Sequence, residues 1–151
     1  MLDKPIRILQ SNLNRSLQAT ESALEVAVQR KIDIVAVQEP WLTRDKDGSF
    51  RNTRSIAHNS YNQILPRHAN NTRPRTLLYI KKDLGLQVTS ETPPYATEDP
   101  DIQILHISDQ QGKTVQLINV YNERDTTGNW TSERTLIQLT PAPNTILLGD
   151  F

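Results

Sequence analysis

The sequence predicts a mixed α/β fold in which helices cover a β-sheet, and three stretches carry this prediction. An apolar run at 6–12 turns polar at its end, a helical pattern begins at Leu17, and a second apolar run occupies 33–40. A strand, a helix and a strand joined over this distance form a right-handed crossover between parallel strands by default. A third run, at 145–151, has three consecutive large aliphatic residues before Gly149 and predicts a short strand buried on both faces.

The spacing of apolar residues and a capping serine predict the first helix. Apolar and small residues recur on one side of a helix with about 3.6 residues per turn. These residues are Leu17, Thr20, Ala23, Leu24, Ala27 and Val28. Ser16 is the predicted N-cap, because a serine oxygen can accept an unpaired amide proton of the first turn. At the end of the second strand, Pro40 is expected to restrict Glu39 to an extended backbone.

The rest of the chain predicts further strands and one more helix. Residues 43–59 are polar and predict a loop. Alternating or continuous apolar residues predict strands at 61–65, 76–80, 84–89, 102–108 and 114–121. The stretch 129–139 predicts a second helix with Asn129 or Thr131 as its cap. No repeat or linker divides the chain, so we expect a single domain over residues 1–151.

Composition excludes several classes of protein. Lys plus Arg and Asp plus Glu both number 17, so no overall basic field marks a dedicated non-specific nucleic-acid binder. No cysteine occurs, which excludes disulfides, thiolate–zinc sites and a cysteine nucleophile. No apolar run approaches the roughly 20 residues of a membrane span and no cleavable signal opens the chain, so we expect an intracellular protein without a membrane partner.

Four of the predicted strands end on a residue with an oxygen-bearing side chain. These residues are Asn12, Glu39, Tyr121 and Asp150. Sites in α/β folds collect at the carboxyl ends of strands, because rigid elements there present side chains to one place. Two carboxylates and an amide without a thiolate favour Mg²⁺, Mn²⁺ or Ca²⁺, and such a metal fits hydrolysis of a phosphate ester. A polar residue after an apolar run is also a common turn former, and the residues alone leave both interpretations open.

Four segments around these residues resemble, in order and spacing, the endonuclease/exonuclease/phosphatase superfamily. The segments are 8–14, 34–41, 117–121 and 146–151. They are most similar to the endonuclease domain that precedes reverse transcriptase in LINE-type retrotransposons, and the Gln-Glu-Pro-Trp sequence is similar to that of fungal elements. The resemblance implies a four-layered α/β/β/α sandwich with two β-sheets face to face.

The resemblance also implies roles for single residues. Glu39 would be the principal ligand of Mg²⁺, with Mn²⁺ as an alternative, and Asn12 would support the metal and the phosphate. Tyr121 would hydrogen-bond the scissile phosphate, and Asp150 would orient or deprotonate the attacking water. The implied activity is that of a divalent-metal-dependent phosphodiesterase that nicks DNA.

Further residues are candidates for contact with the substrate. Arg75, in a basic loop, and Arg124, shortly after the tyrosine, could meet DNA phosphates, and Asn14 follows the first strand closely. A solvated loop whose arginines only favour solubility is the alternative. The expected partners are DNA and, in a parent polyprotein, a reverse transcriptase domain. Composition does not separate nucleus from cytoplasm, and we expect the nucleus.

The superfamily pattern continues after Gly-Asp-Phe with an asparagine, a later aspartate and a Ser-Asp-His element, and none of these lies within the 151 residues. We therefore expect a partial domain, its C-terminal part missing, with little or no nuclease activity and weak or lost DNA binding. Whether the chain is itself an enzyme stays open. The alternatives are a non-catalytic retroelement remnant or partial gene product, and a superfamily member that acts on another phosphate ester, such as an inositol phosphate, a sphingolipid or an RNA tail.

Overall fold

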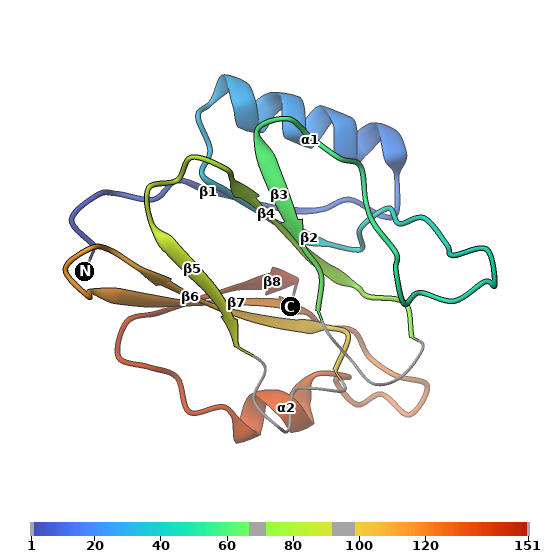
Figure 1. Cartoon of the computed structure of the whole chain (residues 1–151). Helices are drawn as coiled ribbons and strands as arrows, with labels where there is room; N and C mark the ends of the chain where they lie inside the picture. The colour runs from blue at the N-terminus through green and yellow to red at the C-terminus, as the bar shows by residue number, and fades with distance from the viewer. Residues whose placement is uncertain (1, 67–71, 92–98, 151) are drawn as a thin grey trace.

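The structure is a computed structural model that describes residues 2–66, 72–91 and 99–150, and these residues form two four-stranded β-sheets (Figure 1). The first sheet has the strand order β1-β2-β4-β3 and the second β5-β6-β7-β8. The elements are β1 (Ile8–Asn12), α1 (Leu17–Gln29), β2 (Ile34–Gln38), β3 (Tyr61–Ile64), β4 (Thr76–Lys81), β5 (Gln87–Glu91), β6 (Ile102–Ser108), β7 (Thr114–Tyr121), α2 (Glu133–Gln138) and β8 (Thr145–Asp150).

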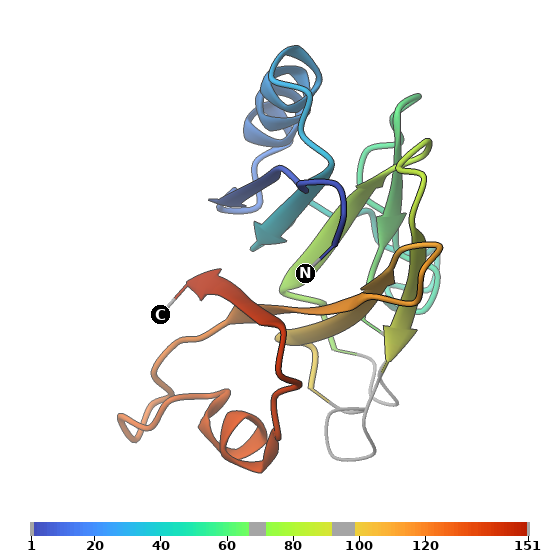
Figure 2. The same ribbon diagram turned by 90° about the vertical axis from the view of Figure 1, so that its left-hand side faces the viewer.

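These elements are stacked in four layers, which confirms the expected α/β/β/α sandwich (Figure 2). Helix α1 packs on the first sheet in an apolar cluster that includes Leu24 and Val35. The two sheets meet in a second cluster, around Ile34 and Leu117, and α2 contributes Leu136 to a third on the outer face of the second sheet. Because side chains alternate between the faces of a strand, neighbouring residues of β2 serve different clusters.

The crossover from β1 through α1 to β2 has the predicted form, with β1 parallel to β2. Ser16 Oγ accepts the backbone N–H of Ala19 at 3.1 Å, so the predicted N-cap is confirmed. The residues of α1 that the sheet buries are Thr20, Leu24 and Ala27. Leu17 and Val28, predicted to share that face, are 42% and 44% exposed, because both lie on one flank of the buried stripe.

Strand β5 begins later than predicted. The expected strand at 84–89 is replaced by a turn over its first half, in which Gly85 has a φ of 73°, and pairing starts at Gln87. Leu84 is buried in the cluster between the sheets instead of alternating along a strand. The strands predicted at 61–65, 76–80, 102–108 and 114–121 are confirmed to within one residue at each end.

Helix α2 is shorter than predicted. Ser132 stands at its N-cap position, in place of the predicted Asn129 or Thr131. Arg124 and Trp130 pair in an isolated antiparallel bridge, which folds the preceding loop back on itself. The bridge uses Trp130, which the sequence pattern had assigned to the first turn of the helix.

Strand β8 forms an edge of the second sheet. The prediction that it is buried on both faces is wrong, because Ile146 and Leu147 are 40% and 50% exposed. Among the described residues β8 pairs with β7 alone, and only its Leu148 reaches the apolar cluster between the sheets. An apolar run of this length therefore indicates a strand correctly but does not show how many neighbours the strand has.

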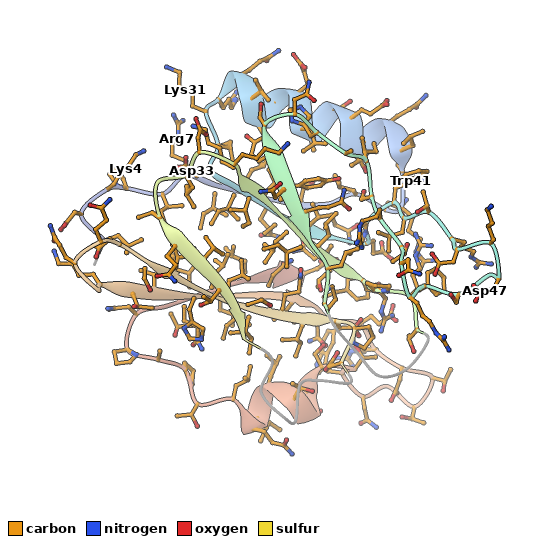
Figure 3. The ribbon with its side chains drawn as sticks, viewed as in Figure 1. Lys4, Arg7, Lys31, Asp33, Trp41 and Asp47 are labelled. Carbon is orange, nitrogen blue, oxygen red and sulfur yellow. The ribbon has the colours of Figure 1, made fainter. Side chains whose placement is uncertain are left out.

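The two ends of β2 lie on opposite sides of the molecule (Figure 3). At its start, Asp33 Oδ2 accepts the backbone N–H of Arg7 at 2.9 Å, which ties β2 to the chain leading into β1. Trp41 lies beyond the other end, where the chain leaves the sheet. Across residues 2–66, 72–91 and 99–150, no helix is long and apolar enough to span a membrane.

Candidate functional site

Four strands end at one edge of the sandwich. Strand β1 is parallel to β2 in the first sheet, and β7 is parallel to β8 in the second. Hydrogen bonds between the sheets place β1 opposite β8 and β2 opposite β7. The residues at or directly after these four carboxyl ends are Asn12, Glu39, Tyr121 and Asp150. The structure thus brings together the four residues singled out in the sequence.

The layer between the sheets turns polar toward this edge. Ile34 and Leu117 fill it near the start of β2 and in the first half of β7, and a chain of amide side chains follows. Gln10 Nε2 donates to Gln38 Oε1 at 3.1 Å, and Gln38 Nε2 donates to Asn119 Oδ1 at 2.6 Å. Gln38 and Asn119 are both fully buried, so their mutual hydrogen bond fixes β2 against β7 just before the site.

Asn12 and Asp150 form one pair across the sheets. Asn12 Nδ2 donates to Asp150 Oδ2 at 2.6 Å, and Asn12 Oδ1 accepts the backbone N–H of Asn14 at 2.9 Å. Both ends of the amide are therefore engaged, which fixes its orientation. Asp150 Oδ1 has no hydrogen-bond partner among the residues that the structure describes, so this oxygen can accept another ligand. Contact of the Asn14 side chain with substrate stays a prediction.

Glu39 and Tyr121 form the second pair across the sheets. The Tyr121 hydroxyl donates to Glu39 Oε1 at 3.2 Å. Arg15 Nη2 lies 3.8 Å from the same oxygen, and Arg15 was not singled out in the sequence. Within the described part of the chain, Glu39 Oε2 has no hydrogen-bond partner, and the Glu39 side chain is 17% exposed. Each pair thus offers one uncommitted carboxylate oxygen at the edge.

The backbone at Glu39 departs from the prediction. An extended conformation was expected before Pro40, but Glu39 has a φ of 48°. Hydrogen bonds on both sides hold it there, because Glu39 N donates to Arg75 O at 2.9 Å and Arg15 N donates to Glu39 O at 2.8 Å. For a residue with a side chain, this left-handed conformation costs roughly 1–2 kcal/mol of conformational free energy. The tertiary hydrogen bonds outweigh the local preference and set the carboxylate beside the tyrosine.

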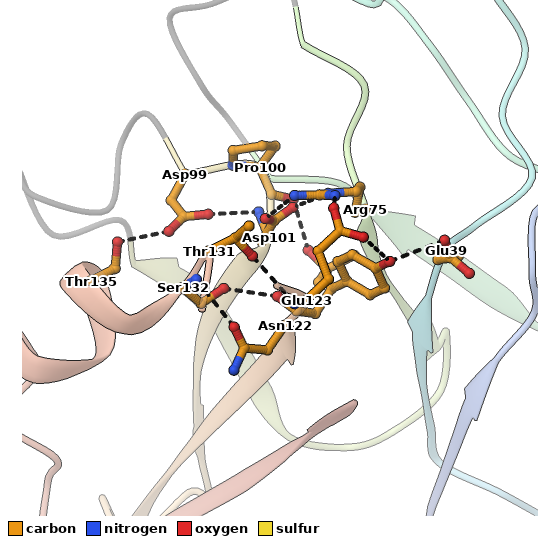
Figure 4. A network of polar contacts seen from close by, with 12 residues as sticks. Glu39, Arg75, Asp99, Pro100, Asp101, Asn122, Glu123, Thr131, Ser132 and Thr135 are labelled. Carbon is orange, nitrogen blue, oxygen red and sulfur yellow. Dashed lines mark hydrogen bonds and ion pairs between the residues drawn. The ribbon is translucent and has the colours of Figure 1, made fainter. Parts of the chain in front are cut away.

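Arg75, Asp101 and Glu123 form a cluster of ion pairs that the sequence did not predict (Figure 4). Arg75 Nε and Nη2 donate to the two carboxylate oxygens of Asp101 at 2.7 and 2.6 Å, and Arg75 Nη1 donates to Glu123 Oε1. The guanidinium carbon lies 4.7 Å from the centre of the Tyr121 ring. The Tyr121 hydroxyl also lies 2.9 Å from Glu123 Oε2. The i, i+2 spacing of Tyr121 and Glu123 was the one available signal, since it places two side chains on one side of an extended chain.

Burial and neighbouring charges shift the pKa values in this cluster. Burial raises the pKa of Tyr121 above its usual 10.0, and the Glu39 carboxylate and its hydrogen bond raise it further. Burial also raises the pKa of Asp101 above 3.8, an effect that the hydrogen bond and charge of Arg75 oppose. Burial alone would lower the pKa of Arg75, but the hydrogen bond and charge of Asp101 outweigh it and raise that pKa. Tyr121 is thus a hydrogen-bond donor at neutral pH.

We expect Tyr121 to be more than half protonated at pH 10. Its folded-state pKa lies above the unfolded value, so its contribution to stability is complete below pH 10 and is lost as pH rises through the folded pKa. The measurement is a pH titration of ¹³Cζ-labelled tyrosine by NMR, with Tyr121→Phe to assign the signal. A midpoint at or below 10.0 for Tyr121 would contradict the surroundings described here.

The two arginines predicted to contact substrate are both held by other side chains. Arg75 is committed to Asp101 and Glu123, and Arg124 stacks on Trp130 with its guanidinium carbon 4.7 Å from the ring centre. Arg124 is exposed beyond the carboxyl end of β7. Contact of either residue with DNA phosphates stays a prediction, and the geometry places both on the same side of the sandwich as Tyr121.

The donor set fits a hard divalent cation. Glu39 and Asp150 supply carboxylate oxygens and Asn12 an amide oxygen, and the chain has no cysteine to supply a thiolate. Mg²⁺ is usually held by one or two protein carboxylates and several waters. Within residues 2–66, 72–91 and 99–150, no group of three or more His, Asp or Glu side chains converges as a metal cage would require. A cation here would therefore keep much of its water.

The two face-to-face mixed sheets, flanked by helices and with four strand ends at one edge, form a fold similar to that of endonuclease/exonuclease/phosphatase-type structures. Two solved structures show this similarity. The endonuclease domain of TRAS1, a telomere-specific non-LTR retrotransposon, superimposes with a TM-score of 0.68 at 23% sequence identity, over 97% of this chain and 58% of that one. The AP endonuclease LMAP from Leishmania major gives a TM-score of 0.56 at 18% identity, over 78% of this chain and 40% of that one.

The chain thus spans 58% of the TRAS1 endonuclease structure, although nearly all of its own residues are matched. No protein-family model matches the sequence, and no curated protein matches it. Structural similarity at this level of identity shows the fold, and the activity has to be argued from the residues at the edge.

Proposed function

We propose that the chain is part of a divalent-metal-dependent endonuclease that cleaves phosphodiester bonds in DNA. The observation that carries the proposal is the pair of hydrogen bonds across the sheets, Asn12 to Asp150 and Tyr121 to Glu39, at the carboxyl ends of four strands. Each pair leaves one carboxylate oxygen uncommitted among the described residues. The similarity to an endonuclease domain of a retrotransposon supports the choice of reaction.

Each of the four side chains would have a role that fits its chemistry. Glu39, with Asn12 in support, would hold Mg²⁺ or Mn²⁺, which when bound polarises a phosphoryl oxygen and lowers the pKa of bound water. Tyr121 keeps its proton at neutral pH and would donate a hydrogen bond to a non-bridging phosphate oxygen. Asp150, held at Oδ2 by Asn12, would use Oδ1 to orient the attacking water and accept its proton.

We further propose that the 151 residues alone have little nuclease activity. They contain no Ser-Asp-His element to stabilise charge on the reacting phosphate. Loss of one such stabilising group commonly costs about 10²–10³ in rate. We also propose a reverse transcriptase domain as the partner in the full polyprotein and action on DNA in the nucleus; both parts of the proposal follow from the resemblance of the sequence to retrotransposon endonucleases.

Metal binding tests the proposal directly. We expect the chain to bind Mn²⁺, measured by the loss of the EPR signal of free Mn²⁺, and Glu39→Gln to weaken binding at least about tenfold, since a lost ligand should cost no less than the roughly 10–100-fold of a lost supporting residue. Glu133→Gln makes the same charge change at an exposed position on α2 and should bind like the unmodified chain.

Equal binding by Glu39→Gln and the unmodified chain would contradict the assignment of Glu39. Plasmid nicking with Mg²⁺ provides the second readout. Robust nicking by the 151-residue chain that Glu39→Ala abolishes would support the endonuclease and contradict the proposed inactivity of the chain alone.

A further inference from the structure

Glu123 is held where an oxyanion would be bound. Its two carboxylate oxygens face two different donors: Oε1 accepts from Arg75 Nη1, and Oε2 lies 2.9 Å from the Tyr121 hydroxyl, from which it can accept. A cationic guanidinium and a neutral hydroxyl converging on the oxygens of one anion are also the donors that bind a phosphate group. Figure 4 shows the Glu123 carboxylate between the guanidinium of Arg75 and the position of Glu39.

The two carboxylates bound to Arg75 differ in how tightly they are held. Asp101 has a side chain that is 4% exposed and makes a bidentate contact, so it holds the guanidinium more firmly. The side chain of Glu123 is 42% exposed and contacts a single nitrogen of Arg75. Glu123 can therefore rotate into solvent more readily than Asp101, which keeps Arg75 in place over the tyrosine ring.

The Tyr121 hydroxyl has one proton to donate and lies near two carboxylate oxygens that could accept it. It lies 2.9 Å from Glu123 Oε2 and 3.2 Å from Glu39 Oε1, and it can donate fully to one of them at a time. While both carboxylates are in place, this proton is directed to one of them and away from any bound phosphate. The backbone of Glu123 is fixed independently of its carboxylate, because Thr131 N donates to Glu123 O at 2.8 Å and Glu123 N donates to Thr131 Oγ1 at 3.3 Å.

We propose that Arg75 Nη1 and the Tyr121 hydroxyl form an oxyanion site, that the Glu123 carboxylate occupies this site in the free chain, and that a phosphate group displaces it. The ligand class is a phosphate mono- or diester oxyanion, and Glu123 acts as an internal competitor that weakens binding. The proposal rests on the proposed function only in identifying that phosphate as part of DNA.

Removing the competitor should strengthen anion binding. The probe is inorganic phosphate, titrated into ¹⁵N-labelled protein and followed at the backbone amides of residues 122–124, with and without Mg²⁺. We expect Glu123→Gln to lower the dissociation constant about tenfold, the change expected when a charge-assisted hydrogen bond no longer has to be broken. Glu133→Gln, an equal change of charge on α2, should leave the constant unchanged. Adding Tyr121→Phe to Glu123→Gln should remove most of the gain.

A second measurement needs no variant. In unmodified protein with ¹³C-labelled carboxyl groups, phosphate should move the Glu123 signal and leave that of Asp101 in place. Unchanged or weaker binding by Glu123→Gln, an equal gain in Glu133→Gln, or a stationary Glu123 signal at saturating phosphate would each overturn the proposal. These readouts do not involve cleavage, so a chain that binds phosphate this way but never cuts DNA would contradict the proposed function alone.

Discussion

Replacing Asn119 by alanine should lower the free energy of unfolding by roughly 3 kcal/mol, the size expected when a buried polar network loses one member. Asn119 Oδ1 accepts from Gln38 Nε2 at 2.6 Å, and its Nδ2 donates to the carbonyl oxygens of Val37 and Leu77 at 3.3 Å. The substitution leaves a buried Gln38 donor without its partner. Urea unfolding followed by circular dichroism measures the effect.

The matched control is Asn62→Ala, which removes the same side chain from an exposed position on β3. Its cost should be within about 0.5 kcal/mol, as for most surface substitutions. A double-mutant cycle with Gln38→Leu should show strong coupling to Asn119, because the two amides contact each other directly. Equal costs for Asn119→Ala and Asn62→Ala would contradict the buried network.

Replacing Gly149 by alanine should cost about 3 kcal/mol, the upper end of the usual cost of overpacking. A Cβ built at Gly149 would lie 2.2 Å from the carbonyl oxygen of Val120, and this atom belongs to the backbone of the neighbouring strand. The backbone of β7 cannot move away from the added Cβ without breaking the hydrogen bonds that pair it with β8. The displaced strand would also move Asp150 away from Asn12, so Mn²⁺ binding should weaken together with the loss of stability.

Gly112→Ala is the control that separates the loss of stability from the loss of Mn²⁺ binding. Gly112 has a φ of 82° in the hairpin before β7, and no atom lies within 4 Å of a Cβ added there. Its substitution should cost about 1–2 kcal/mol through the backbone alone and leave Mn²⁺ binding unchanged. A Gly149→Ala protein that is as stable as the unmodified chain would contradict the close approach of the two strands.

The parts of this fold that were predictable are those that local pattern determines. Continuous apolar runs and a capped amphipathic helix define β1, α1 and β2, and the parallel pairing expected of strands joined by a long crossover places Asn12 and Glu39 at one edge. The approach of Tyr121 and Asp150 to that edge came from the resemblance, since no local pattern shows which strands of two different sheets face each other.

The parts that were not predictable depend on distant residues. Arg75 is 26 residues from Asp101 and 48 from Glu123, so their contacts arise only when β4, β6 and β7 are assembled. The left-handed backbone of Glu39 overrides the preference that Pro40 imposes, because Arg75 and Arg15 bind its peptide groups from either side. Exposure of β8 could not be read from three aliphatic residues, since it depends on how many strands lie beside them.

The polar contacts between the sheets also link ligand binding at this edge to the stability of the whole fold. Asn12 with Asp150 and Glu39 with Tyr121 join the two sheets, whose described strands share no backbone hydrogen bonds with each other. An ion or phosphate bound to residues of both sheets would hold the sheets together. A ligand that binds only the folded state raises the stability of that state in proportion to the logarithm of the ligand concentration. The melting temperature of this protein should therefore report occupancy of the edge even when no bond is cleaved.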